Sequence, residues 1–218
     1  MIINLLAGGP VDYIPNLKEY DSYGKEEIVW AGIDRGVYHL LQFGIKPKVA
    51  FGDFDSVTEE EFQEIVCEVN ELKRFHPEKD ETDMELALNW AISQRPRKIH
   101  IFGGTGGRLD HFMANVSLLL KPLQVIEDCM VEIIDRNNII FFKKPGIHSI
   151  ERDAEKKYIS FLPVSPEITG LTLKGFKYPL NNCHISIGST LCISNELIIN
   201  HGTFSFNQGI LMVIRSRD

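Results

Sequence analysis

The first two thirds of the chain alternate short apolar runs with longer amphipathic stretches. The apolar runs predict strands at Ile2–Ala7, Ile28–Ile33, Val49–Phe51, Glu71–Phe75, Lys98–Phe102 and Val131–Asp135. Thr58 and Thr82, each followed three residues later by a glutamate, predict two helix starts, and Leu109–Leu120 predicts a helix stopped by Pro122. This alternation is typical of parallel strands joined by right-handed crossovers. We therefore predict an α/β domain, a parallel sheet with flanking helices of Rossmann-like type.

The pattern changes after Lys144, Pro145 and Gly146. Short β-branched or aromatic runs follow, separated by Gly, Pro and Asn, without a helical period. They predict strands at Tyr158–Leu162, Leu171–Leu173, Cys183–Ile187, Glu196–Asn200, Thr203–Phe206 and Ile210–Ile214. We expect two domains, an α/β domain at residues 1–144 and a small all-β sandwich at residues 145–218.

Composition and charge narrow the class of protein. The 218 residues are 44% hydrophobic and 24% charged, as in an ordinary globular chain, and the formal net charge of −7 disfavours non-specific binding of nucleic acid or an acidic membrane. The four cysteines form no C-x-x-C pair, and "MIINLLAGGP" lacks the basic flank of a signal peptide. We expect reduced cysteines, no membrane span and a cytoplasmic protein.

Polar and glycine residues follow most of the predicted parallel strands. The segments are Gly8-Gly9-Pro10, Asp34-Arg35-Gly36, Gly52-Asp53-Phe54-Asp55-Ser56, "HPEKDETD" with Lys79, Asp80 and Asp83, and "GGTGGRLDH" with Arg108, Asp110 and His111. Because ligands of open parallel sheets bind at the carboxyl ends of the strands, these five segments are expected to form one site.

Four carboxylates at one edge of a sheet repel one another unless a cation lies among them. Asp34, Asp53, Asp55 and Asp83 are the candidates, and Mg²⁺ is the expected ion because it takes carboxylate and phosphate oxygens. Arg35, Lys79 and Arg108 would then meet phosphate charge, and the glycines of "GGTGG" would let main-chain N–H groups approach an anion.

Each feature also has a purely structural interpretation. Asp53 and Asp55 could serve a turn, Asp80 and Asp83 could favour the N-terminus of a helix, and "GGTGG" could be only a flexible turn. The segment lacks both the P-loop and the G-x-G-x-x-G fingerprints. The structural interpretations would all have to hold at one edge of one sheet, and we therefore favour a ligand site.

The segments "GIDRG", "KPKVAFGDFDSV", "PEKDETDMELAL" and "FGGTGGRLDHFMANVSLL" occur in this order and closely resemble the thiamine pyrophosphokinase (thiamine diphosphokinase) family. The later segments "GLTLKGFKYPL", "ISNE" and "GILMVI" are similar to its second domain. The resemblance implies a nucleotide-binding α/β domain, a thiamine-binding and dimerising β-sandwich, and a homodimer with active sites at the subunit interface. It further implies Mg²⁺-dependent transfer of a pyrophosphoryl group from ATP to the hydroxyl of thiamine, giving thiamine diphosphate and AMP.

The same resemblance implies roles for individual residues. Asp53, Asp55 and Asp83 would be the magnesium-associated acids with Asp34 near them, and all four would be catalytic. The residues expected to contact ATP are Arg35, Lys79, Asp80, Arg108 and Asp110. Ser194 and Asn195 would meet the thiamine pyrimidine. The chain lacks a tryptophan that some relatives carry after this pair, so the aromatic contact is unassigned, with Phe204 and Phe206 as guesses.

Two other functions remain open from the sequence. One is a kinase of another small alcohol, which would release ADP rather than AMP. The other is a non-enzymatic sensor that binds thiamine or a nucleotide without turnover.

Overall fold

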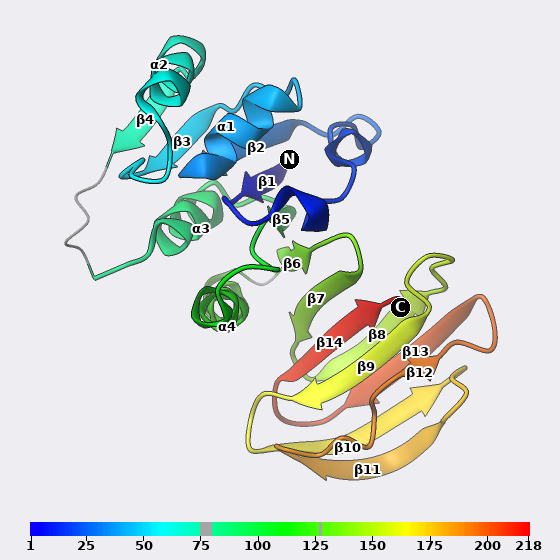
Figure 1. Cartoon of the computed structure of the whole chain (residues 1–218). Helices are drawn as coiled ribbons and strands as arrows, with labels where there is room; N and C mark the ends of the chain where they lie inside the picture. The colour runs from blue at the N-terminus through cyan, green and yellow to red at the C-terminus, as the bar shows by residue number, and fades with distance from the viewer. Residues whose placement is uncertain (75–79, 127) are drawn as a thin grey trace. The chain divides into compact units, whose positions relative to one another are not determined.

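The computed structural model describes residues 1–74, 80–126 and 128–218 of the chain. Its contacts divide the chain into two compact units, Met1–Arg136 and Asn137–Asp218 (Figure 1). Each unit builds its own core, and each is described by itself below.

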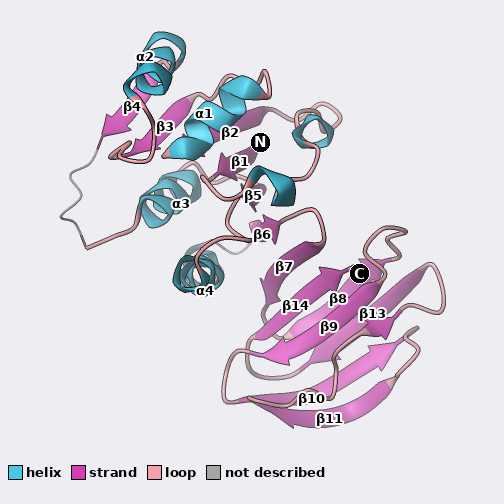
Figure 2. Cartoon of the chain, viewed as in Figure 1, coloured by secondary structure: helices cyan, strands magenta, loops and turns pink. Residues whose placement is uncertain are grey.

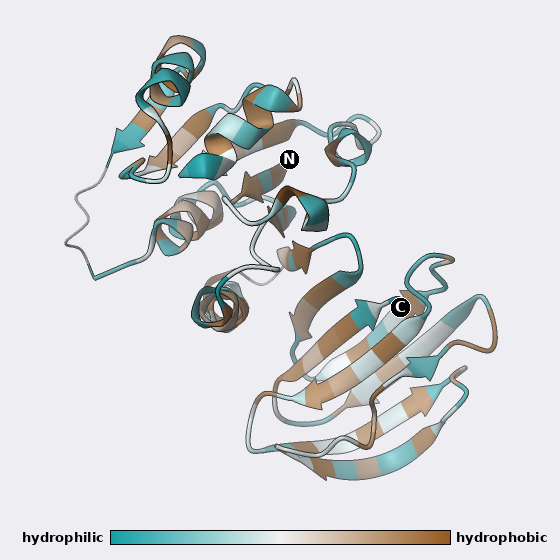
Figure 3. Ribbon diagram, in the orientation of Figure 1, coloured by the Kyte–Doolittle hydropathy of each residue, from teal (hydrophilic) through white to brown (hydrophobic). Residues whose placement is uncertain are grey.

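The described residues of the first unit form six parallel strands in the order β6-β5-β1-β2-β3-β4. Their bounds are β1 Ile2–Leu6, β2 Ile28–Ile33, β3 Val49–Gly52, β4 Glu71–Arg74, β5 Lys98–Phe102 and β6 Met130–Ile134. The central strands β1, β2 and β5 are mostly apolar and buried, as expected when both faces of a sheet are covered, and they are largely brown in Figure 3; Asn4 of β1 and His100 of β5 are buried polar residues among them. The predicted parallel sheet with helices is confirmed for this unit.

Helices cover both faces of this sheet. The α-helices are α1 Arg35–Gln42, α2 Glu59–Glu68, α3 Asp83–Ser93, α4 Leu109–Leu118 and α5 Leu120–Val125, with 3₁₀ turns η1 Val11–Tyr13 and η2 Leu17–Tyr20. Adjacent residues of β3 point to opposite faces of the sheet and meet different helices. Ala50 packs with Val37 of α1 and Ile65 of α2 on one face, whereas the ring of Phe51 contacts Trp90 of α3 on the other.

Two helix starts follow the predicted capping pattern. The Thr58 hydroxyl accepts a hydrogen bond from the Glu61 main chain, and the Glu61 carboxylate accepts one from the Thr58 main chain, which completes a capping box. Thr82 accepts from the main-chain N–H of Glu85 at the start of α3. The prediction that Pro122 ends a helix is wrong, because Pro122 lies in the first turn of α5. N–H groups in the first turn have no partner within the helix, so the N–H that proline lacks is not missed there.

The second unit consists of antiparallel strands (Figure 2). One set has the order β12-β9-β14-β7 and the other the order β11-β10-β13-β8. The bounds are β7 Asn138–Lys143, β8 Gly146–Glu151, β9 Tyr158–Pro163, β10 Glu167–Lys174, β11 Leu180–Ser186, β12 Asn195–Glu196, β13 His201–Phe206 and β14 Leu211–Ser216. The strand predicted at Glu196–Asn200 is wrong, because β12 ends at Glu196.

The core of this unit comes from alternate residues of its strands. In β13, Gly202, Phe204 and Phe206 are buried, while the residues between them are more exposed. The ring of Phe204 lies 5.1 Å from that of Phe161, centroid to centroid. This packing corrects one guess made from the sequence, because Phe204 and Phe206 are 1% and 2% exposed and therefore cannot offer a ring to a ligand.

Candidate active site

The carboxyl ends of the parallel strands meet at one edge of the sheet in the first unit. Strands β2, β3 and β4 follow one another on one side of β1, whereas β5 and β6 lie on its other side. The strand order therefore reverses between β1 and β5. The loops after these two strands are joined by main-chain hydrogen bonds, from Ala7 to Phe102 at 2.9 Å and from Gly9 to Gly103 at 3.0 Å. Such a reversal is where open α/β sheets bind ligands.

Asp34 follows β2 and lies against the end of β3. Its main-chain N–H donates to the Phe51 carbonyl at 2.8 Å, and a Cβ added to Gly52 would lie 2.0 Å from its Oδ1. Gly52 also has a φ of +147°, which side chains rarely adopt. Only glycine at this position therefore leaves room for the Asp34 carboxylate.

Asp53, Asp55 and Asp83 are electrostatically coupled. The main-chain N–H of Asp55 donates to Oδ1 of Asp53 at 3.1 Å. The pKa of Asp55 is raised above its ordinary value, chiefly by the charge of Asp53, then by desolvation and a hydrogen bond with Asp53, and also by the charge of Asp83. The charge of Asp83, in the first turn of α3, thus reaches Asp55 in the loop after β3.

The backbone is unusual at the same positions. Asp34 has a φ of +49°, and Phe54, between Asp53 and Asp55, has a φ of +62°. A positive φ is uncommon for residues other than glycine, and it is an outlier for a bulky residue such as phenylalanine. Strained conformations of this kind concentrate at functional sites, where the surrounding structure holds them in place.

The donor set suits a hard cation. All of the acids offer oxygen ligands, and a cation would relieve the repulsion that raises the pKa of Asp55. Within the described residues, no group of three or more His, Cys, Asp or Glu side chains is gathered closely enough to hold a metal ion alone. A cation at these acids would therefore need waters or phosphate oxygens to complete its shell.

The basic residues near this edge are already engaged by protein groups. Arg35 donates to the Glu61 carboxylate at 2.7 Å and to the Ser56 carbonyl at 2.8 Å, so it ties the loop after β3 to α2. Arg108 donates from Nη2 to Asp110 at 2.6 Å, with both side chains largely exposed. Asp80 is exposed, and Lys79 lies outside the described residues.

Arg108 and Asp110 form a surface pair at the start of α4. Two hydrogen bonds from the guanidinium lower the pKa of Asp110 to about 2, and the main-chain N–H of His111 contributes in the same direction. The pairing raises the pKa of Arg108. Both groups therefore keep their charge at neutral pH.

Ser194 and Asn195 lie in the second unit and differ in exposure. Ser194 is exposed, with a φ of +55°, and its main-chain N–H donates to the Ser160 hydroxyl at 3.0 Å. Asn195 is 2% exposed, and its amide bonds to both main-chain groups of Tyr178, at 3.0 Å to the N–H and 2.8 Å to the carbonyl. Asn195 therefore fixes the Tyr178 segment, whose ring is 56% exposed.

Reasoning from the sequence missed a buried polar contact at the carboxyl edge. The Thr105 hydroxyl donates to Oδ2 of Asp135 at 2.9 Å, and both residues are less than 9% exposed. Asp135 directly follows β6. The rule that selected the other acids, a polar residue after a parallel strand, would also have selected this one.

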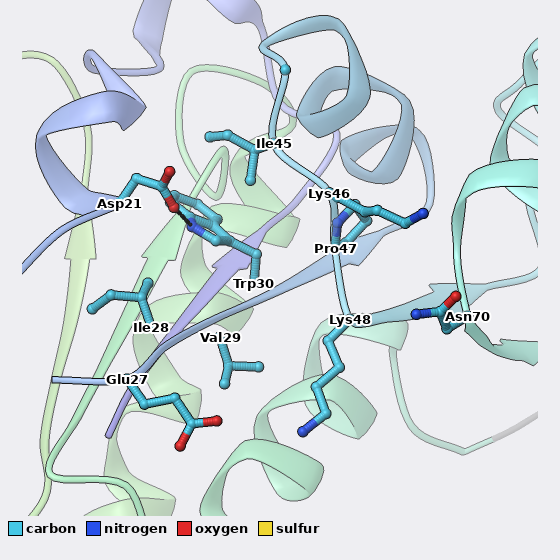
Figure 4. Close-up of a pocket in the computed structure, with 11 residues that line it drawn as sticks. Asp21, Glu27, Ile28, Val29, Trp30, Ile45, Lys46, Pro47, Lys48 and Asn70 are labelled. Atoms are coloured by element: carbon cyan, nitrogen blue, oxygen red, sulfur yellow. Dashed lines mark hydrogen bonds between the residues drawn. The ribbon is translucent and has the colours of Figure 1, made fainter.

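A cavity of about 430 Å³ opens elsewhere in the first unit (Figure 4). Its lining includes Ile28, Lys48 and Asn70, at or just before the first residues of β2, β3 and β4, and Trp30, whose indole donates to Asp21 at 2.8 Å. It therefore lies at the amino ends of the strands, at the opposite edge from Asp34, Asp53, Asp55 and Asp83. None of the helices in the described part of the chain is both long and apolar enough to cross a membrane.

Two family models match the chain. The model described as "Thiamin pyrophosphokinase, catalytic domain" matches residues 20–132, and "Thiamin pyrophosphokinase, vitamin B1 binding domain" matches residues 147–211. A curated thiamine pyrophosphokinase of Bacillus subtilis is 52% identical over 216 residues, with 99% of each chain covered.

Solved structures agree with these matches. The crystal structure of thiamine pyrophosphokinase from Bacillus subtilis has a TM-score of 0.93 and 50% identity, and all of both chains is covered. The structure of thiamin pyrophosphokinase from Geobacillus thermodenitrificans has a TM-score of 0.90 and 49% identity, covering 100% of this chain and 98% of that one.

Proposed function

The chain belongs to the thiamine pyrophosphokinase family, and from this premise we propose how its residues carry out the reaction. The enzyme is a thiamine diphosphokinase, which forms thiamine diphosphate from thiamine with ATP as co-substrate. The observation that carries this assignment is that both family models match one chain, in the expected order.

The reaction proposed is pyrophosphoryl transfer. The thiamine hydroxyl oxygen forms a bond to the β-phosphorus of ATP, the bond from that phosphorus to the bridging oxygen of AMP breaks in line, and AMP leaves with this oxygen. A carboxylate accepts the hydroxyl proton, and Asp55 and Asp83 are our candidates. Such a transfer depends on positioning and charge neutralisation rather than on a covalent enzyme intermediate.

Mg²⁺ is the proposed metal, with Asp53, Asp55 and Asp83 as the acids associated with it, directly or through its waters. Bound Mg²⁺ supplies charge neutralisation at the phosphate oxygens. The coupling of Asp55 to Asp53 and Asp83 supports this assignment, because acids that repel one another favour a shared cation. We place Asp34 beside them as a fourth catalytic acid, and Arg35, Lys79, Asp80, Arg108 and Asp110 on the nucleotide side.

We propose a functional division at residues 144 and 145. Residues 1–144 would form a Rossmann-like catalytic domain, and residues 145–218 a β-sandwich that forms the dimer and binds thiamine at Ser194 and Asn195, where the buried Asn195 holds the Tyr178 segment in place. The separate matches at 20–132 and 147–211 support this division. A cytoplasmic location stays a prediction, supported by the four cysteines, all of which are free.

A homodimer is the proposed assembly. Leu191, Ile193, Ile198 and Ile199 flank Ser194 and Asn195 and are 42% to 65% exposed, which is unusual for a cluster of large apolar side chains. A second copy of the chain covering this cluster would complete the thiamine site. Light scattering on the Ile198→Asp variant, beside the unaltered protein, tests this, and an unaltered protein that is a monomer contradicts it.

The reaction is tested by incubating the protein with ATP, Mg²⁺ and thiamine, with and without EDTA, and separating the products by chromatography. We expect equal amounts of AMP and thiamine diphosphate, both abolished by EDTA. Release of ADP would favour a kinase of another alcohol. Binding of thiamine without any turnover would favour a sensor.

A further inference from the structure

The loop Gly103–Gly107, which joins β5 to α4, is held by three neighbouring segments. The Thr105 hydroxyl donates to Asp135 after β6 at 2.9 Å, and Asn115 Nδ2 of α4 donates to the Gly104 carbonyl at 3.1 Å. The main-chain N–H of Gly9, after β1, donates to the Gly103 carbonyl at 3.0 Å. Three elements of the first unit therefore fix one loop at the carboxyl edge of the sheet.

These hydrogen bonds engage two carbonyl groups and one hydroxyl of the loop, but none of the main-chain N–H groups of the loop. In the part of the chain that the structure describes, the N–H groups of Gly104 and Thr105 donate to no protein group, although both residues are buried. Buried N–H groups in native proteins are nearly always paired, by protein, water or ligand. The loop also leads directly into α4, a ten-residue helix with its positive dipole end at Arg108 and Leu109.

A role in stability alone explains the buried acid poorly. Thr105, Asn115 and Asp135 are each 8% exposed or less. Burying a carboxylate is costly, and well-packed apolar side chains commonly serve stability as well as a buried polar pair does. What a directional hydrogen bond adds is one fixed loop conformation.

We propose that Asp135 and Asn115 are positioning residues that hold the Gly103–Gly107 loop in the conformation that receives the phosphate chain of ATP. Asp135 acts through the Thr105 hydroxyl, and Asn115 acts through the Gly104 carbonyl. Neither residue touches the reacting atoms. This inference rests on the proposed function. It assigns to Asp135 and Asn115 an effect on ATP affinity that is separate from the catalytic acids Asp34, Asp53, Asp55 and Asp83.

The Thr105→Val variant tests the proposal, because valine matches threonine in shape and lacks the hydroxyl. We expect the KM for ATP to rise about tenfold, as for the loss of one strong hydrogen bond, with the KM for thiamine within about twofold. Thr105→Ser, which keeps the hydroxyl, should restore the KM for ATP. Asp135→Ala should act through the same bond, so Thr105→Val should add little further effect in the double variant.

Thr172→Val is the matched control, because Thr172 of β10 also bonds through its hydroxyl, to the main chain of Gly170 and Asn182. It should lower the melting temperature without raising the KM for ATP. Equal rises in the KM for ATP and for thiamine in Thr105→Val, or an effect no larger than that of Thr172→Val, would overturn the positioning role. If the unaltered protein forms no thiamine diphosphate, the proposed function itself fails, and the two failures are thereby distinguished.

Discussion

The main-chain N–H of Asp55 donates to the carboxylate of Asp53, and the charge of the same carboxylate raises the pKa of Asp55. The hydrogen bond fixes the turn of the chain, whereas the like charges oppose each other. The loop after β3 therefore holds two acids whose mutual repulsion a bound cation would relieve.

Asp55→Asn should strongly reduce turnover and leave the fold intact. The side chain of Asp55 is exposed, so its loss removes a charge for the metal but little packing. Removal of one carboxylate should reduce kcat at least about a hundredfold, as expected for a group that stabilises transition-state charge. The assay is chromatographic detection of AMP, beside a melting curve. Glu167→Gln, an exposed acid at the start of β10, is the control and should retain activity. Near-normal activity of Asp55→Asn would contradict the metal site.

Gly52→Ala should lower activity by displacing Asp34. The added methyl group would lie 2.0 Å from Asp34 Oδ1, far inside van der Waals contact, so the carboxylate must move. Gly44→Ala is the matched control, because Gly44 also has a positive φ, +73°, but nothing lies within 4 Å of its added Cβ. Each variant should lose about 1–3 kcal/mol of unfolding free energy from the strained backbone conformation alone. Only Gly52→Ala should also lower kcat, because only this variant displaces the Asp34 carboxylate. Equal kcat values for the two variants would exclude the proposed role of Asp34.

The sequence predicted the first unit well because periodicity and topology act together there. Ile28–Ile33 and Lys98–Phe102 match β2 and β5, since buried parallel strands are mostly apolar runs. The carboxyl-end rule then placed Asp34, Asp53 and Asp55 at one edge of the sheet. The coupling of Asp83 to Asp55 across the start of α3 could be expected only once that rule was applied.

The remaining features depend on contacts between residues that are distant in the sequence. From the sequence, Phe204 and Phe206 could equally be ligand contacts or core residues. Only the pairing of β13 with β8 and β10 shows that they face the core. The expectation that Asn195 meets thiamine stays a prediction, and its hydrogen bonds to Tyr178, 17 residues away, were not foreseen. No local pattern reports such a bond, because each partner is ordinary by itself.

ATP binding should raise the pKa of Asp110. In the free protein, Arg108 holds this pKa at about 2, below the ordinary 3.8, so the pairing favours the folded state above about pH 4 and loses its effect as pH falls toward 2. If Arg108 turns to nucleotide phosphates, Asp110 loses its main partner and its pKa returns toward 3.8. Carboxyl NMR titration with and without a non-hydrolysable ATP analogue measures this.

The Arg108→Gln variant is the reference for this titration. It should show the raised pKa of Asp110 without any nucleotide, and little change in unfolding free energy at neutral pH, because exposed ion pairs contribute little to stability. A pKa that stays at about 2 when the analogue is bound would show that Arg108 keeps Asp110 and does not contact the phosphates.

Asn195→Ala should weaken thiamine binding by releasing the Tyr178 segment. The buried amide bonds to the N–H and carbonyl of Tyr178, and its loss leaves these main-chain groups without their partner, at a cost of about 1–3 kcal/mol in unfolding free energy. We expect the KM for thiamine to rise and the KM for ATP to stay unchanged, since Asn195 belongs to the second unit. Urea unfolding and separate titrations of the two substrates measure these effects. Asn181→Ala, an exposed asparagine in β11, is the control and should change neither quantity. Equal weakening of both substrates by Asn195→Ala would instead indicate general loss of structure and argue against a thiamine site at Ser194 and Asn195.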